Sequence, residues 1–180
     1  NLANHLFPEE LLQLEKLNTI TKIRLNSSKP VLFYPGSGSD ILYPLLFLDN
    51  TIDTLTAVTM IFVDKKNNLP MIKSILNDVG ISFTGDTTIA FYWKNIPVKL
   101  QFIITNVFQY DPPLFDIYFE RKLAIFREGN EQYESKIFEK LRNGGLLISD
   151  FGFNNFQLNK ISIPRELSVY REMIVGKKII

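Results

Sequence analysis

The chain has 180 residues, of which 46% are hydrophobic and 22% are charged, so it is long enough for one sizeable core and short for two domains. Its 20 Lys and Arg residues balance 19 Asp and Glu residues, which gives no broad attraction to nucleic acid or to an anionic membrane. The lack of cysteine and the single histidine, His5, argue against disulfides, cysteine nucleophiles and zinc clusters. We therefore expect small-molecule or protein partners, no metal site, and chemistry based on oxygen and amide groups.

The first predicted element is an amphipathic helix over residues 8–17, where leucines recur at helical spacing between charged residues. We expect residues 1–28 to form a helical cap, with His5 as an ordinary surface residue. The chain has no apolar run of about 18 residues and no leader-like start, so we expect a soluble, cytoplasmic protein with no membrane partner.

A run that is apolar at nearly every position, residues 31–34, predicts a strand buried on both faces. The Gly36-Ser37-Gly38 turn follows, and its glycines would let a ligand approach the backbone closely. Ser39 or Asp40 is then expected to cap a helix that runs to about Leu48.

The same strand and helix unit repeats further along the chain. A second apolar run over residues 57–63 ends at Asp64, and residues 69–79 have the periodicity of a helix stopped by Gly80. Residues 88–93 and 98–104 then predict a hairpin whose second arm is the third main strand of the sheet.

The third main strand is followed by Thr105 and Asn106, and a fourth strand over residues 115–119 ends in Glu120-Arg121. A helix over residues 131–141, stopped by Asn143-Gly144-Gly145, leads to a fifth strand over residues 146–150. The tail, broken by Pro164 and Gly176, suits one or two further strands at a sheet edge.

This alternation predicts an α/β fold: an open, mostly parallel, Rossmann-like sheet with helices on both faces and an antiparallel C-terminal edge strand. We expect one domain over residues 1–180, with an α/β core at 29–150 and an edge-strand tail at 151–180. Ligands of such sheets bind at the carboxyl ends of the strands. The polar residues that follow the first four predicted strands therefore belong to one candidate site.

At these motifs the chain resembles the class I S-adenosylmethionine-dependent methyltransferases, over residues 31–150. The resemblance lies in the Tyr34-Pro-Gly-Ser-Gly-Ser39 turn, Phe62-Val-Asp64, Leu114-Phe-Asp-Ile-Tyr118 and the stretch from Leu141 to Asp150. It implies S-adenosylmethionine as cofactor, with Gly36 and Gly38 against its methionine part, Asp64 on the ribose hydroxyls, and Thr105 with Asn106 beside the adenine.

Two positions differ from the usual pattern of that family. Tyr34 stands where an acidic residue is common, and Asp40 stands where a third glycine is common. Asp40 would oppose a pyrophosphate but could pair with the amino group of S-adenosylmethionine. The predicted cofactor-binding set is Tyr34, Gly36, Ser37, Gly38, Asp40, Asp64, Thr105 and Asn106.

The leading hypothesis is thus a methyltransferase-like protein that binds S-adenosylmethionine and acts on an unidentified acceptor. Methyl transfer mainly needs positioning and exclusion of water, and where a base is needed Glu120 is the predicted catalytic residue. A non-catalytic binding or scaffold domain that keeps the fold is the alternative. A NAD(P)-binding Rossmann protein ranks third, because Ile41 stands where the dinucleotide motif has its third glycine.

Overall fold

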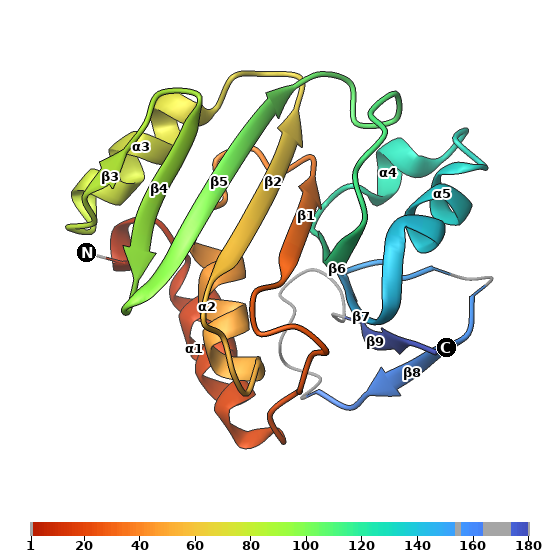
Figure 1. Ribbon diagram of the computed structural model, residues 1–180. Coiled ribbons are helices and arrows are strands. Elements are labelled where there is room, and N and C mark those ends of the chain that lie inside the picture. Colours follow the sequence, from red (N-terminus) through yellow and green to blue (C-terminus); the bar gives the residue numbers. More distant parts are fainter. Residues whose placement is uncertain (1, 154–155, 164–173, 180) are drawn as a thin grey trace.

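The computed structural model describes residues 2–153, 156–163 and 174–179, and its centre is a parallel sheet (Figure 1). Five parallel strands form this centre: β1 (Val31–Pro35), β2 (Val58–Asp64), β5 (Ile96–Ile104), β6 (Phe115–Glu120) and β7 (Leu141–Ser149). They lie in the order β5-β2-β1-β6-β7, so the strand order reverses at β1. Every residue of β6 is buried, including the carboxylates Asp116 and Glu120.

Antiparallel strands extend the sheet at both edges. On one side β4 (Thr88–Trp93) pairs with β5, and β3 (Phe83–Thr84) pairs with β4. On the other side β9 (Ile174–Lys178) pairs with β7 and with β8 (Leu158–Ile161), which forms the edge. The prediction of antiparallel strands from the tail is confirmed, and the predicted break at Pro164 lies outside the described residues. The predicted break at Gly176 is wrong, because this glycine lies inside β9 and is paired with Leu147 and Lys160.

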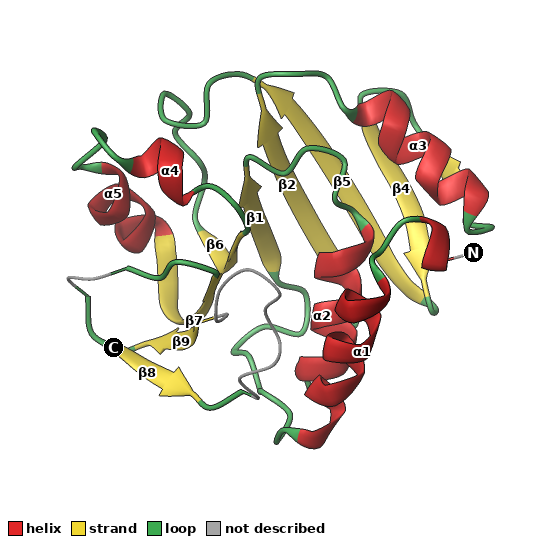
Figure 2. Cartoon of the chain, turned by 180° about the vertical axis from the view of Figure 1, so that it is seen from behind, coloured by secondary structure: helices red, strands yellow, loops and turns green. Residues whose placement is uncertain are grey.

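Helices cover both faces of the sheet, as predicted. The helices α1 (Pro8–Lys16), α2 (Leu42–Thr51) and α3 (Leu69–Asp78) lie on one face, which is turned toward the viewer in Figure 2. The opposite face carries α4 (Ala124–Arg127) and α5 (Tyr133–Lys140). Successive residues of β1 accordingly enter different cores: Tyr34 packs on the α2 side, and Phe33 packs on the α5 side.

Two short 3-10 helices, Leu2–Asn4 and Leu17–Thr19, flank α1. None of the helices in the described ranges is long and apolar enough to cross a membrane.

The start of α2 differs from the prediction. The N-cap is Ile41, and no side chain caps the helix, because the Asp40 carboxylate is hydrogen-bonded elsewhere, to Tyr34 and Arg121.

The glycine pair near residue 144 also has a different role from the predicted one. The backbone is already extended at Leu141, so α5 ends at Lys140 and both glycines lie inside β7. The pairing of β7 with β6 shifts register here, and Gly144 adopts a φ of +76°. A Cβ atom at Gly145 would lie 2.8 Å from the Asp116 carbonyl oxygen, so this glycine is needed for the close approach of two strands.

Candidate functional site

The Gly36-Ser37-Gly38 turn folds back over the end of β2. Gly36 and Gly38 have φ angles of +63° and +53°, a region that glycine enters without steric cost. The Gly36 amide donates a 2.8 Å hydrogen bond to the Val63 carbonyl, and a Cβ at Gly36 would lie 2.9 Å from Leu123 Cδ1. Backbone conformation and close packing therefore both favour glycine at position 36.

Asp64, the last residue of β2, contacts this turn directly. Its Oδ2 accepts a 2.8 Å hydrogen bond from the Gly38 amide, and its Oδ1 accepts one from the Lys66 amide at 3.3 Å. Gly38 and Asp64 were predicted from the sequence to lie at the same edge of the sheet. In the structure they are in direct contact through this hydrogen bond between the Gly38 amide and Asp64 Oδ2.

A cavity of about 580 Å³ opens beside this turn, within the range of sites for small organic ligands. Its walls come from the N-terminal segment, the glycine turn, the ends of β2 and β6, and α3. The lining residues are Asn4, His5, Leu6, Phe7, Glu10, Tyr34, Gly36, Ser37, Gly38, Ser39, Asp40, Ile41, Leu42, Asp64, Met71, Ile75, Arg121 and Lys122. Six of the eight predicted cofactor-binding residues are among them.

Arg121, which follows β6, links two carboxylates in the cavity wall. Its Nη1 donates to Asp40 Oδ2 at 3.0 Å, and its Nη2 donates to Glu10 Oε1 at 2.5 Å. The guanidinium also lies over the Tyr43 ring, 3.6 Å from its centroid. Burial alone would lower the pKa of Arg121, but the Asp40 carboxylate and its other neighbours outweigh burial and raise it, so the side chain stays charged.

Tyr34 and Asp40, the two positions that differ from the family pattern, contact each other. The Tyr34 hydroxyl donates a 2.7 Å hydrogen bond to Asp40 Oδ2. Burial and the nearby Asp40 carboxylate raise the pKa of Tyr34 well above its ordinary value, so the hydroxyl remains a neutral donor.

The charges that line the cavity favour a cationic ligand. Three carboxylates, from Glu10, Asp40 and Asp64, face two cationic side chains, from Arg121 and Lys122. The lining thus has a net negative charge when His5 is neutral. Because S-adenosylmethionine carries a sulfonium, an ammonium and a carboxylate, its net charge complements this lining.

The other predicted site residues lie outside the cavity lining. Thr105 donates its backbone N–H to the Asp64 carbonyl, and the Asn106 side chain accepts from the Phe108 amide, so both stabilise the loop after β5. They are next to Asp64 in the sheet but are absent from the residues that line the cavity. Their contact with an adenine stays a prediction.

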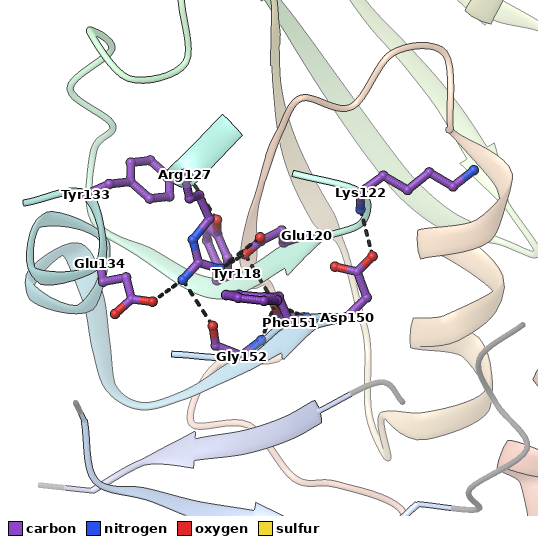
Figure 3. Close-up of polar contacts among 10 residues, drawn as sticks. Tyr118, Glu120, Lys122, Arg127, Tyr133, Glu134, Asp150, Phe151 and Gly152 are labelled. Carbon is purple, nitrogen blue, oxygen red and sulfur yellow. Dashed lines mark hydrogen bonds and ion pairs between the residues drawn. The ribbon is translucent and has the colours of Figure 1, made fainter. Parts of the chain in front are cut away.

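Glu120 also lies away from the cavity, in a buried polar cluster (Figure 3). It is fully buried, both of its carboxylate oxygens accept 2.9 Å hydrogen bonds from Arg127, and Ser149 donates to Oε2 at 3.2 Å. Burial raises the pKa of Glu120, and the pairing with Arg127 opposes this rise. The role of Glu120 as a base stays a prediction that its placement does not favour.

Sequence reasoning missed the contribution of the N-terminal segment to the cavity. His5, Phe7 and Glu10 reach it from the first ten residues, and Arg121 contacts Glu10 although the two are 111 positions apart. Nothing in the local sequence marks Glu10 as buried, because it lies in a helix of conventional amphipathic pattern.

Comparison with known proteins gave structural matches alone: no family model matches the chain, and no curated protein matches it. A Methanococcus maripaludis protein, provisionally assigned as an S-adenosyl-L-methionine-dependent methyltransferase, is 13% identical with a TM-score of 0.56; the match covers 99% of this chain and 90% of that one. The S-adenosylmethionine-dependent methyltransferase SibL, in its apo form, is 10% identical with a TM-score of 0.53; that match covers 96% of this chain and 55% of SibL. The chain has the class I methyltransferase fold.

A third structure, a Thiobacillus denitrificans S-adenosylmethionine-dependent methyltransferase in complex with S-adenosyl-L-homocysteine, is 12% identical with a TM-score of 0.46; the match covers 87% of this chain and 51% of that one. The chain thus spans about half the length of SibL and of this third protein. In the class I methyltransferase fold described above, the glycine turn follows the first strand and Asp64 ends the second, so both lie at the reversal of strand order.

Proposed function

We propose that the chain binds S-adenosylmethionine in the cavity beside the glycine turn and acts as a methyltransferase. The observation that carries the proposal is the hydrogen bond that joins the Gly38 amide to the Asp64 carboxylate, at the edge of the sheet where such folds bind ligands. The fold that the chain shares with the M. maripaludis and SibL structures supports it.

The residues present suit the ribose and the amino-acid part of this cofactor. The Asp64 carboxylate lines the cavity and has further lone pairs for ribose hydroxyls, beyond those that face Gly38 and Lys66. Asp40 offers an anion for the ammonium group, and Arg121 offers a cation for the carboxylate. When bound, the cofactor would supply a methyl group on a sulfonium; the chain's own part is to hold it, orient the acceptor and exclude water.

Binding of S-adenosyl-L-homocysteine, measured by titration calorimetry, tests the proposal. We expect saturable binding to the wild-type protein, competition by S-adenosylmethionine, and no binding of NAD. If the wild-type protein binds neither methionine-derived ligand at millimolar concentration, the proposal is overturned. The alternative, a non-catalytic domain with this fold, would then be favoured.

Asp64→Asn sharpens this test, because an asparagine oxygen can still accept from the Gly38 amide while the charge on the ribose side is lost. We expect a loss of about 1.5–3 kcal/mol in binding free energy, or about 10–150-fold in Kd. Asp86→Ala is the matched control, since that side chain is fully exposed and lies outside the cavity. Equal affinity of the Asp64 variant and the control would refute the role of Asp64.

A further inference from the structure

His5 is the only histidine of the chain, and its side chain lines the cavity beside the glycine turn. The ring is 23% exposed, and its Nε2 lies 2.6 Å from Asp78 Oδ2, at the end of α3. The Asp78 carboxylate is held ionised, because its hydrogen bond with His5 lowers its pKa. A carboxylate therefore fixes one ring nitrogen, as in other histidines oriented for proton transfer.

The acidic side chains that line the cavity already have hydrogen-bond or ion-pair partners. Glu10 and Asp40 pair with Arg121, and Asp64 accepts from two backbone amides. His5 Nδ1, in contrast, has no hydrogen-bond partner among the described residues. Histidine is also the side chain that enzymes use most often for general acid and base catalysis.

Apolar side chains flank His5 in the same cavity. Phe7 and Met71 are 59% and 56% exposed although both are large and hydrophobic, and Leu6 and Ile75 complete this part of the wall. An apolar body could cover these side chains while a polar group meets the imidazole.

We propose that His5, oriented by Asp78, is the proton acceptor of the methyl transfer, and that the acceptor substrate carries an O–H or N–H group on an apolar body. The inference rests on the proposed function. The acceptor oxygen or nitrogen forms a bond to the methyl carbon, the carbon–sulfur bond breaks with its electron pair returning to sulfur, and the acceptor proton moves to Nδ1. The sulfonium becomes a neutral thioether and the imidazole becomes an imidazolium, so charge and atoms balance.

Nitrogen-detected NMR of the untagged protein gives a direct test, because a single histidine gives a single set of ring signals. In the neutral ring we expect the proton on Nε2, directed at Asp78, and a bare Nδ1. Addition of S-adenosyl-L-homocysteine should shift the ring signals. Asp78→Ala should weaken the tautomer preference, while Asp86→Ala should leave it at the wild-type level.

Methyl transfer to small phenols and aromatic amines, used as probe acceptors, adds a kinetic test. His5→Gln should bind S-adenosyl-L-homocysteine with unchanged affinity but lose about 100-fold or more in rate. Its rate should also lose the acidic limb of the wild-type pH profile. A histidine that only clamps the N-terminal segment to α3 would change stability and leave this profile in place.

The outcomes separate the two proposals. If the wild-type protein does not bind S-adenosyl-L-homocysteine, the proposed function fails, and the role of His5 fails with it. If the ligand binds but the ring signals stay unchanged, or the proton resides on Nδ1, the role of His5 alone is overturned.

Discussion

Replacing Arg127 with methionine tests the buried polar cluster around Glu120, the residue predicted from the sequence to be the catalytic base. The guanidinium is 5% exposed, contacts both oxygens of Glu120 at 2.9 Å, and donates to the Gly152 carbonyl at 3.0 Å (Figure 3). Glu134 accepts a further hydrogen bond from it. The methionine side chain can fill similar space but can donate none of these bonds.

The expected loss of stability follows from the charge left behind. Removing one partner of a buried ion pair leaves the other charge buried without a counterion, and such changes lower the free energy of unfolding by about 3–5 kcal/mol. Arg142→Met is the matched control, because Arg142 pairs with Asp116 at 3.2 Å but is 48% exposed. Because Arg142 is half-exposed and the buried Asp116 carboxylate keeps its 2.8 Å hydrogen bond from the Val31 amide, losing this pair should cost no more than about 1 kcal/mol.

The effect should depend on pH with a definite sign. Burial already raises the pKa of Glu120 above its unfolded value, and losing Arg127 removes two effects that lower it. At pH values between the unfolded and the folded pKa of Glu120, this carboxyl binds a proton in the folded state but not in the unfolded state. The free energy of unfolding therefore falls as the pH rises through this range. The difference between Arg127→Met and wild type should therefore be largest at about pH 8 and smaller at about pH 5.

Urea unfolding at the two pH values, followed by circular dichroism, measures both quantities. A loss below about 1 kcal/mol at the higher pH, comparable to the loss in the Arg142 control, would refute the account of a stranded buried charge. A loss that grows toward acidic pH would contradict the sign of the Glu120 titration.

Two further predictions concern the cavity wall. Tyr34→Phe should lower the free energy of unfolding by about 1 kcal/mol, because the Asp40 carboxylate loses a buried donor, and urea unfolding checks this. Gly36→Ala should cost more than Gly38→Ala, since both have positive φ but only Gly36 also places its Cβ against Leu123. Equal melting temperatures of the two alanine variants would contradict the packing argument.

The local apolar runs made the sheet predictable. Residues 31–34 and 115–119 are apolar at nearly every position, and strands of this kind have to lie inside a sheet covered on both faces. Helices between them then restrict the connections to parallel crossovers. The confirmed parallel pairing of β1 with β2 and with β6 follows from these two facts.

The roles of single polar and glycine residues were less predictable, because they depend on distant partners. Asp40 has the local signature of a helix N-cap, but its carboxylate instead accepts a hydrogen bond from Arg121, 81 positions later in the chain. Gly145 has the signature of a helix stop, yet it is required by the approach of the Asp116 carbonyl from the neighbouring strand. Neither partner is visible in the sequence near the residue that it governs.

The two departures from the methyltransferase pattern fit together as a pair. With glycine at position 40, the buried Tyr34 hydroxyl would lack its acceptor, and with an acidic residue at position 34, two carboxylates would compete for Arg121. The observed combination satisfies both groups and keeps one carboxylate in the cavity wall, six positions later in the chain. The acidic group that is common at position 34 in the family is thus present at position 40 in this chain. This supports the proposed cofactor site over the alternative of a non-catalytic domain that has lost the site.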